Sequence, residues 1–277
     1  MQVSIIIINY NTYQFTCNCI QSIYDKTIGI DFEIILVDNA STECDADLFK
    51  QKYPAIILIK SEKNVGFAGG NNLGIGVAQG EYILLLNSDT EFISNSIKFI
   101  YDKCIPLKDL GAATIKLIYP DGTIQSVANY FPNVWLHFLE TSRLFRLCKK
   151  YYYRKIPVLN YTKDFTADWI WGTFYFFPKT NLDYAGGKLS ETFFLYVEDV
   201  EWGYLFAKQG LKNYYFSESA IIHYCGQSSN SKEKGKLINK NHLLFIKKYN
   251  GTCSSYIEKY LVRLDRYIEL LKEKCRL

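Results

Sequence analysis

The sequence lacks the patterns of several common classes of protein. No apolar stretch approaches the roughly 20 residues that are needed to span a bilayer. The eight cysteines form no repeated CxxC pair, and neither Cys17-x-Cys19 nor His223-x-Cys225 has the spacing of a zinc site. The first apolar stretch, residues 3–8, is too short for the core of a signal peptide. We therefore expect a cytoplasmic protein whose thiols stay reduced.

The phosphate-binding signatures of common nucleotide enzymes are absent as well. No G-x-G-x-x-G motif opens the first expected helix, and the chain has no P-loop. The glycines from Gly74 to Gly80 have the wrong spacing, and they precede an expected strand instead of following one. These absences argue against a dinucleotide-binding oxidoreductase, an alternative that a measurement of NAD binding would test.

The composition is that of a folded protein with one large domain or two small ones. The chain has 277 residues, of which 48% are hydrophobic and 22% are charged. From Lys232 to the end, 12 basic and 5 acidic residues give a net charge of +7, whereas the remainder, with 20 basic and 23 acidic residues, carries −3. The body is mildly acidic and the tail is basic. We expect no nucleic-acid partner.

Apolar runs alternate with helical patterns through the first half of the chain. This alternation predicts an α/β fold whose parallel strands are joined by right-handed crossovers. Polar loops follow Ile8, Val37 and Leu86, and the carboxyl ends of parallel strands gather at one edge of a sheet. Ligand chemistry is therefore expected at that edge. The expected strands are residues 3–8, 33–37, 55–59 and 82–86.

The second half of the chain is less regular. Strands are expected at residues 112–118, 169–177 and 220–222, and a helix at residues 199–209. Residues 129–165 are rich in aromatic and basic side chains but have weak periodicity. We expect them to form a mobile loop over the site.

Two helical segments end the chain, and the last one has an apolar stripe with basic residues between its members. Such a helix can pack on the body, pair with a second subunit in a homodimer, or lie on an anionic membrane surface. These alternatives remain open from the sequence. The stripe consists of Ile257, Tyr260, Leu261, Leu264, Ile268 and Leu271.

Six short motifs follow one another in a distinctive order. They are IINYN at 7–11, LVDNAST at 36–42, NVGFAGGN at 64–71, LLNSD at 85–89, FFLYVEDVEW at 193–202 and HYCG at 223–226. In order and spacing these motifs resemble the family-2 glycosyltransferases of the GT-A fold, in particular the rhamnosyltransferase-like branch. Six ordered motifs are much stronger evidence than any single one of them.

The resemblance implies an α/β domain over residues 1–230, with a mixed, mostly parallel central sheet flanked by helices. Residues 1–118 would form the half that binds the nucleotide-sugar. Residues 119–230 would form the half that holds the acceptor and the catalytic base. Residues 231–277 would be a basic, helical C-terminal extension.

The resemblance places the nucleotide-sugar at the strand ends of the first half. Asp38 would accept a hydrogen bond from the pyrimidine N3–H, and Asn9 would help to hold the nucleotide. The glycines from Gly66 to Gly70 would let the backbone approach the ligand closely. Each of these residues also has an ordinary role as a turn or helix-capping residue. The residues implied are Asn9, Asp38, Asn64, Gly66, Gly69, Asn87 and Ser88.

Asp89 is the implied ligand of Mg²⁺ or Mn²⁺, because a carboxylate at the exit of a buried strand suits a hard cation that neutralises a diphosphate. Members of the family often have Asp-x-Asp here, whereas this chain has Asn87 in the first position. The missing charge suggests a second protein ligand, and His223 is the candidate. Taken alone, Asp89 is also typical of a strand-to-turn cluster, and His223 of a structural histidine.

Asp199 is the implied catalytic base, which would take the proton of the acceptor hydroxyl as that oxygen attacks the anomeric carbon. The same position is also typical of an N-cap aspartate. Glu198, Trp171 and Trp202 are candidates for the acceptor side, although aromatic residues make up 16% of the chain and core packing competes as an explanation.

Together these features predict an inverting, metal-dependent glycosyltransferase. It would move a sugar from a nucleoside diphosphate-sugar, of the dTDP-rhamnose or UDP-hexose type, to a glycan or lipid-linked glycan in surface polysaccharide synthesis. The basic tail would bring it to the inner face of the cell membrane. The alternative is a non-catalytic glycan- or nucleotide-binding protein on the same fold, against which the presence of both Asp89 and Asp199 argues.

Overall fold

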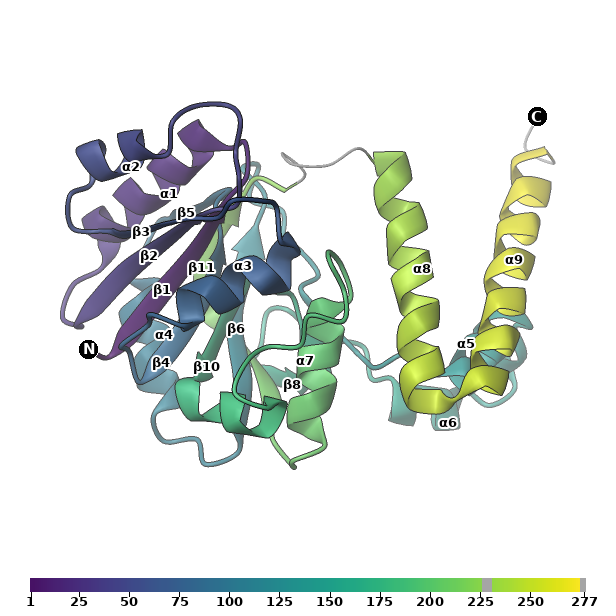
Figure 1. The fold of residues 1–277 in the computed structure, drawn as a ribbon. Coiled ribbons are helices and arrows are strands. Elements are labelled where there is room, and N and C mark those ends of the chain that lie inside the picture. Colours follow the sequence, from purple (N-terminus) through teal and green to yellow (C-terminus); the bar gives the residue numbers. More distant parts are fainter. Residues whose placement is uncertain (226–230, 275–277) are drawn as a thin grey trace. The chain divides into compact units, whose positions relative to one another are not determined.

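The structure is a computed structural model that describes residues 1–225 and 231–274. The chain divides into two compact units. We call residues 1–129 and 159–231 the sheet unit, and residues 130–158 and 232–277 the helical unit. Both units can be followed in Figure 1.

The sheet unit is built around a mixed, mostly parallel sheet. Its strands are β1 (Val3–Asn9), β2 (Phe32–Asp38), β3 (Ile57–Lys60), β4 (Tyr82–Asn87), β5 (Thr90–Phe92), β6 (Leu110–Ile118), β8 (Phe165–Ala167), β10 (Phe174–Pro178) and β11 (Lys212–His223). They follow the order β3-β2-β1-β4-β10-β6-β11-β5, and β8 pairs with β11. Strands β1 to β4 pair in parallel, as do β6 and β11, whereas β10, β5 and β8 run antiparallel to their neighbours.

Helices cover both faces of this sheet, so its central strands are buried on both sides (Figure 1). Alternate side chains of β1 point to opposite faces, so Ile5 and Ile7 join one core and Ile6 joins the other. The first core is covered by α1 (Tyr13–Lys26), α2 (Asp47–Lys52) and α4 (Ser96–Cys104). The second is covered by α3 (Gly66–Ile75), the 3₁₀ helix η2 (Lys179–Ala185) and α7 (Glu198–Ala207).

Two strands of the second half differ from the sequence prediction. The strand expected at residues 169–177 is broken into β9 (Trp169–Ile170) and β10. The break includes Gly172, where an added Cβ would lie 2.8 Å from the ring of Phe67. Strand β9 pairs instead with β7 (Ala128–Asn129) in a separate two-stranded sheet. The short strand expected at residues 220–222 is the end of β11, which has 12 residues and two register shifts against β6.

The helical unit contains the segment for which a mobile loop was expected. That expectation is wrong, because residues 130–158 include α5 (Val134–Thr141), the 3₁₀ helix η1 (Leu144–Arg146) and α6 (Lys149–Lys155). They group with α8 (Ser231–Asn250) and α9 (Thr252–Lys274), whereas the sequence prediction kept them in the first domain. No described helix is both long enough and apolar enough to cross a membrane.

The apolar stripe of α9 is only partly covered. Leu261 is buried, and α5 packs against α9 within the helical unit. Tyr260 and Leu271, from the same stripe, are exposed. Packing within the protein, which was one of the alternatives for this helix, therefore covers only part of the apolar stripe. The rest of the stripe is exposed.

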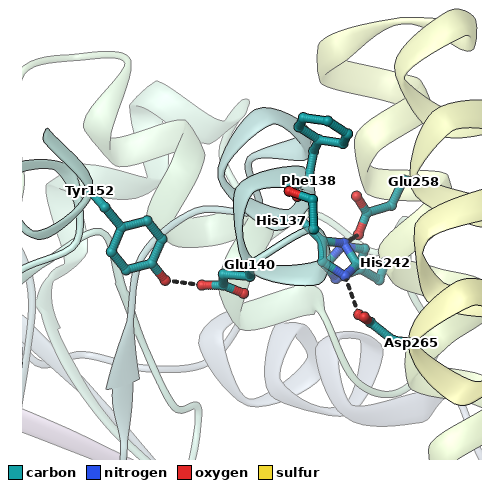
Figure 2. A network of polar contacts seen from close by, with 8 residues as sticks. His137, Phe138, Glu140, Tyr152, His242, Glu258 and Asp265 are labelled. Atoms are coloured by element: carbon teal, nitrogen blue, oxygen red, sulfur yellow. Dashed lines mark hydrogen bonds and ion pairs between the residues drawn. The ribbon is translucent and has the colours of Figure 1, made fainter. Parts of the chain in front are cut away.

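A cluster of charged side chains ties α5 to α8 and α9 (Figure 2). The Nδ1 of His137 lies 2.8 Å from Oε1 of Glu258, and its Nε2 lies 2.7 Å from Oδ2 of Asp265. His242 approaches the same Glu258 oxygen at 3.1 Å. Hydrogen bonds to Glu258 and Asp265 raise the pKa of His137 to about 9 despite its partial burial. Burial favours the neutral form of Glu258, but the hydrogen bonds from both histidines outweigh it and lower the pKa of this carboxyl to about 2.

Candidate active site

The polar residues that end β1, β2 and β4 lie side by side at one edge of the sheet. Asn9 is the register partner of Asp38, and Ile8, next to Asn9, is the partner of Asn87. This follows from the parallel pairing, which puts the carboxyl ends of neighbouring strands together. The expectation that the polar loops meet at one edge is therefore confirmed by the strand register.

Asn9 and Asp38 form a buried pair. The amide Nδ2 of Asn9 donates to Oδ1 of Asp38 at 2.8 Å and to Oγ of Ser41 at 2.9 Å. The amide oxygen of Asn9 accepts from Thr12 at 3.1 Å and from Thr16 at 2.8 Å. The nitrogen and the oxygen of the Asn9 amide are thus both hydrogen-bonded, and the bond from the nitrogen holds the Asp38 carboxylate in one orientation. The Asp38 carboxylate also accepts the Ser41 N–H at 3.1 Å, and it keeps lone pairs for a further donor.

Asn39, which the sequence analysis did not single out, joins the end of β2 to the glycine-rich loop. Its side-chain nitrogen donates to Oδ1 of Asn64 at 3.0 Å, and its oxygen accepts the N–H of Val65 at 3.0 Å. Asn64 in turn accepts the N–H of Gly66 at 2.9 Å. Gly69 lies inside α3, where an added Cβ would come 3.1 Å from the Val65 side chain. The sequence signal for Asn39 was its place in the LVDNAST motif, directly after Asp38.

Gly66 is the point where the second half of the site touches the first. It has φ +79°, a conformation that glycine adopts readily, and an added Cβ would lie 2.3 Å from the carbonyl oxygen of Phe194. The N–H of Phe67 donates to that same oxygen at 2.9 Å. The loop before α7 therefore rests directly on the glycine-rich loop, and a side chain at residue 66 would separate them.

The backbone just before α7 is strained. Tyr196 and Val197 have φ values of 68° and 77°, and Val197 is β-branched, a class of residue that rarely occupies this region. Each such residue costs on the order of 1–3 kcal/mol, and such costs are concentrated at functional sites. The two residues that follow are Glu198 and Asp199, so the strain lies at the start of the helix that carries the expected base.

Asp199 is held by two backbone N–H groups. Its Oδ2 accepts from Gly172 at 3.2 Å, and its Oδ1 accepts from Val200 at 2.9 Å. Asp199 is partly buried, and the loss of solvent around its carboxyl group raises the pKa of Asp199 to about 6, although the two hydrogen bonds oppose the rise. Glu198 is 5% exposed, and burial together with the charge of Asp199 raises its pKa well above the usual range. A carboxylate with a pKa near 6 is ionised at neutral pH and is more basic than an ordinary aspartate.

Thr173 connects the Asp199 site to the end of β4. The N–H of Asn87 donates to the carbonyl oxygen of Thr173 at 3.0 Å, and the Asn87 side chain donates to the Thr173 hydroxyl at 3.3 Å. Thr173 follows Gly172, whose N–H binds Asp199. The hydroxyl of Ser88 lies 3.0 Å from that of Thr12. The ends of β1 and β4 and the start of α7 thus share one region of the sheet edge.

Asp89 and His223, 134 positions apart in the chain, lie next to each other. The Nε2 of His223 is 3.4 Å from Oδ1 of Asp89, and the N–H of Tyr224 donates to the Asp89 carbonyl oxygen at 3.0 Å. The contact arises because β11 pairs with β5, where His223 is the partner of Thr90. Both side chains are largely buried.

Gln125, which the sequence analysis did not find, fixes the orientation of the His223 ring. Its Nε2 donates to the carbonyl oxygen of His223 at 2.8 Å, so its amide oxygen must be the atom that lies 2.7 Å from Nδ1 of His223. An amide oxygen only accepts hydrogen bonds, so Nδ1 carries the proton. In neutral His223, the lone pair is then on Nε2, which faces Asp89.

This arrangement fits a divalent cation. Neighbouring ligands of a metal with bonds of about 2.1 Å lie about 3 Å apart, close to the separation of the Asp89 and His223 atoms. A histidine that donates its other N–H to an oxygen is the usual form of a metal ligand. No group of three or more His, Cys, Asp or Glu side chains suited to a metal occurs among the residues that the structure describes. Two protein ligands leave positions open for diphosphate oxygens and water.

The two tryptophans considered for the acceptor side differ in environment. Trp202 is 1% exposed, and its ring stacks on Phe67 while its indole N–H donates to the carbonyl oxygen of Ser190 at 3.1 Å. A buried ring of this kind has no free face for a sugar, so core packing accounts for Trp202. Trp171 is only partly buried and precedes Gly172, beside Asp199.

Comparison with known proteins shows where the chain is similar to others. A family model described as "Glycosyl transferase family 2" matches residues 4–105. The chain is 37% identical over 94 residues to the poly(ribitol-phosphate) beta-glucosyltransferase of Bacillus spizizenii, a match that covers 32% of this chain and 15% of that protein. It is 38% identical over 103 residues to the UDP-Glc:alpha-D-GlcNAc-diphosphoundecaprenol beta-1,3-glucosyltransferase WfaP of Escherichia coli, which covers 35% of this chain and 41% of the relative.

The matched segment thus spans less than half of either relative. Among solved structures, a crystal structure of GalNAc-T7 with UDP, GalNAc and Mn²⁺ has a TM-score of 0.62 at 14% sequence identity, with 89% of this chain and 48% of that chain covered. At this identity the likeness shows the fold alone. The expectation of a GT-A fold with a mixed, mostly parallel sheet flanked by helices is confirmed.

Proposed function

We propose that this chain is a family-2 glycosyltransferase that works with inversion and with a divalent metal, Mg²⁺ or Mn²⁺. The observation that carries the proposal is the meeting of three chemical groups at one sheet edge. Asp38 ends β2, the Asp89–His223 pair follows β4, and Asp199 is linked to β4 through Gly172 and Thr173. The family-model match over residues 4–105 supports it independently.

In the proposed reaction, Asp199 takes the proton of an acceptor hydroxyl. The oxygen forms a bond to the anomeric carbon of the donor sugar, and the bond from that carbon to the diphosphate oxygen breaks with its electron pair. A cation held by Asp89 and His223 would neutralise charge on the leaving diphosphate, so no separate general acid is required. Attack opposite the leaving group inverts the anomeric centre. The raised pKa of Asp199 suits it to this task, since an ordinary aspartate is a weaker base.

The donor is proposed to be a nucleoside diphosphate-sugar whose base is read by Asp38. A UDP-hexose is favoured over dTDP-rhamnose, since the name of the Escherichia coli relative specifies UDP-Glc. The acceptor is proposed to be a glycan or lipid-linked glycan of a surface polysaccharide. The name of the Escherichia coli relative specifies a sugar linked to diphosphoundecaprenol, which is a lipid-linked acceptor. The name of the Bacillus spizizenii relative specifies poly(ribitol-phosphate), a polymer of a sugar alcohol and phosphate. A lipid-linked acceptor would place the enzyme at the inner face of the membrane.

A donor screen tests the proposed function. Purified protein is incubated with single nucleoside diphosphate-sugars and Mn²⁺, and release of the nucleoside diphosphate is measured by mass spectrometry with and without added glycan acceptors. The expected result is metal-dependent release from one donor that rises when an acceptor is present. Binding of a nucleotide-sugar with no release under any acceptor condition would favour the non-catalytic alternative. The variant Asp183→Asn, at an exposed site in η2, serves as a control and is expected to release the nucleoside diphosphate as the parent does.

A further inference from the structure

One stretch of the helical unit carries an unbroken positive charge. Between Glu140 and Asp164 the chain has no acidic residue, and six basic residues fall between positions 143 and 155. All six are exposed. In the part of the chain that the structure describes, none of the six takes part in an ion pair. They are Arg143, Arg146, Lys149, Lys150, Arg154 and Lys155.

The same stretch exposes apolar side chains. Leu147 is 86% exposed and Val158 is 81% exposed, which is unusual for aliphatic residues in a folded segment. Leu144, Tyr151 and Tyr153 are also exposed. Single exposed apolar residues are normal, but five within positions 144–158, interleaved with cations, form a surface of mixed character. We call positions 143–158 the basic-apolar segment.

The segment is held in place by its inner side. Tyr152 is buried with Leu136 and Leu139 in a small core, and Phe145 and Ile156 pack against it. The Tyr152 hydroxyl also donates to the Glu140 carboxylate (Figure 2). The outward side chains are therefore presented by a packed framework, so their exposure is a property of the fold.

Three kinds of partner could cover such a surface, and their chemistry differs. A nucleic acid would pair with the cations but would gain little from Leu147 and Val158, which have no flat face to stack on a base. A second copy of this chain in a symmetric dimer would place like charges against each other. An anionic bilayer offers negative headgroups to the cations and an acyl boundary to the apolar side chains. Of these three partners, the bilayer is the one that satisfies both features of the segment.

We propose that the basic-apolar segment docks the protein on an anionic lipid surface. Tyrosine and leucine side chains enter the headgroup region, and the arginines and lysines extend around them toward lipid phosphates. Helix α9 adds exposed Tyr260 and Tyr267, with the exposed cations Arg263 and Arg266 on the same helix. The basic tail considered from the sequence is thus a second contributor, and positions 143–158 hold the denser cluster.

The proposal deepens the proposed function, because a lipid-linked acceptor lies at a bilayer surface. Its test needs no turnover, however. Co-sedimentation with phosphatidylcholine vesicles, with or without phosphatidylglycerol, measures docking directly. Release of nucleoside diphosphate from the donor in the absence of vesicles measures the catalytic site. A failure of docking is therefore distinguishable from a failure of the glycosyltransferase assignment.

The first comparison reverses charge at three exposed positions. The triple variant Arg146→Glu, Lys149→Glu and Lys150→Glu is expected to weaken binding to anionic vesicles by about a hundredfold or more, because three attractions between basic side chains and the lipid surface are lost and three repulsions replace them. The matched control reverses three exposed lysines of the sheet unit, Lys26, Lys108 and Lys208, and so makes the same change in net charge. It is expected to bind nearly as well as the parent protein. Equal weakening in both variants would overturn the proposal.

The second comparison removes the apolar part. The double variant Leu147→Ser and Val158→Ser is expected to retain salt-sensitive binding but to lose the fraction that persists at high salt, since screening acts on charge and not on apolar insertion. Both side chains are exposed, so folding is expected to be preserved, and circular dichroism checks this. If the double variant binds vesicles at high salt as well as the parent does, the proposal is overturned. It is also overturned if the parent binds no vesicles but forms a concentration-dependent dimer that the charge variant abolishes.

Discussion

The imidazole Nε2 of His223 lies 3.4 Å from Oδ1 of Asp89, and the Gln125 amide fixes which ring nitrogen faces the carboxylate. This relationship makes Gln125 a positioning residue for the proposed metal. The variant Gln125→Leu removes both of its hydrogen bonds to His223, and partners of this kind typically contribute about 10–100-fold in metal affinity. Titration of Mn²⁺ by electron paramagnetic resonance, with UDP present, measures the effect.

The control for this experiment is Gln21→Leu, an exposed glutamine on α1 whose side-chain amide donates to Asp25. It is expected to leave Mn²⁺ affinity unchanged. If His223→Ala abolishes Mn²⁺ binding while Gln125→Leu binds as tightly as the parent, then the ring orientation does not depend on Gln125, and the tautomer argument fails.

Gly66 provides a test of the junction between the two halves of the site. The variant Gly66→Ala would force a Cβ to within 2.3 Å of the Phe194 carbonyl oxygen, in a backbone conformation with φ +79°. We expect it to reduce the free energy of unfolding by about 1–3 kcal/mol or more, and to weaken nucleotide-sugar binding as the α7 loop shifts. Urea unfolding and isothermal titration measure the two effects.

The matched control is Gly122→Ala, whose φ of +85° imposes the same backbone strain but whose added Cβ meets no atom within 4 Å. The difference between the two variants isolates the steric contact with Phe194. Equal losses of stability, with unchanged nucleotide-sugar binding in both, would show that the contact contributes nothing.

The pH dependence of turnover follows from the pKa of Asp199, which burial raises to about 6. The base acts only when ionised, so kcat/KM is expected to fall by about tenfold for each pH unit below 6 and to level off above it. An unperturbed aspartate would give the same break near 4. A pH–rate profile with the metal held saturating distinguishes them, and a profile flat down to pH 4.5 would contradict a base of raised pKa.

The helical unit has a pH dependence of another kind. The pKa of His137 is raised to about 9, so its contribution to stability is full below about 6.5 and is lost as the pH rises through 9. The pKa of Glu258 is lowered to about 2, so its contribution is full above about 4.5 and is lost as the pH falls toward 2. Protection of the α5 and α9 amides against hydrogen exchange is expected to be greatest between about pH 4.5 and 6.5, where both contributions are full.

The variant His137→Gln keeps a hydrogen-bonding side chain but cannot carry charge. Protection of α5 and α9 is expected to be lower than in the parent at pH 6, and to be nearly constant between pH 6.5 and 9, where the parent declines. A decline in the variant as steep as that of the parent would mean that another group is responsible.

Much of the fold could be predicted from the sequence, because local patterns determine it. The run ending at Leu86 and the β-branched run from Val3 are apolar on both faces, which is typical of central strands. The carboxyl ends of parallel strands meet, so Asn9, Asp38 and Asn87 could be placed at one edge of the sheet from the sequence alone. The motif order then brought Asp89 and His223 together, and these lie in contact.

The rest depends on contacts that no local pattern encodes. Gln125 follows an exposed turn and belongs to none of the motifs, so its role becomes visible only when β11 places His223 beside it. Residues 130–158 have weak periodicity because part of their packing comes from far along the chain, as in the pair of His137 with Glu258. A stretch whose partners are more than 100 positions away gives little sign of its own fold.

The central claim is that Asp199 deprotonates the acceptor at the same sheet edge that binds the donor. The most direct test is the variant Asp199→Asn, which preserves the shape of the side chain and removes its basicity. The account predicts that kcat falls by at least about 100-fold, while nucleotide-sugar affinity stays within a few fold of the parent. Near-normal turnover by Asp199→Asn, with intact donor binding, would contradict it.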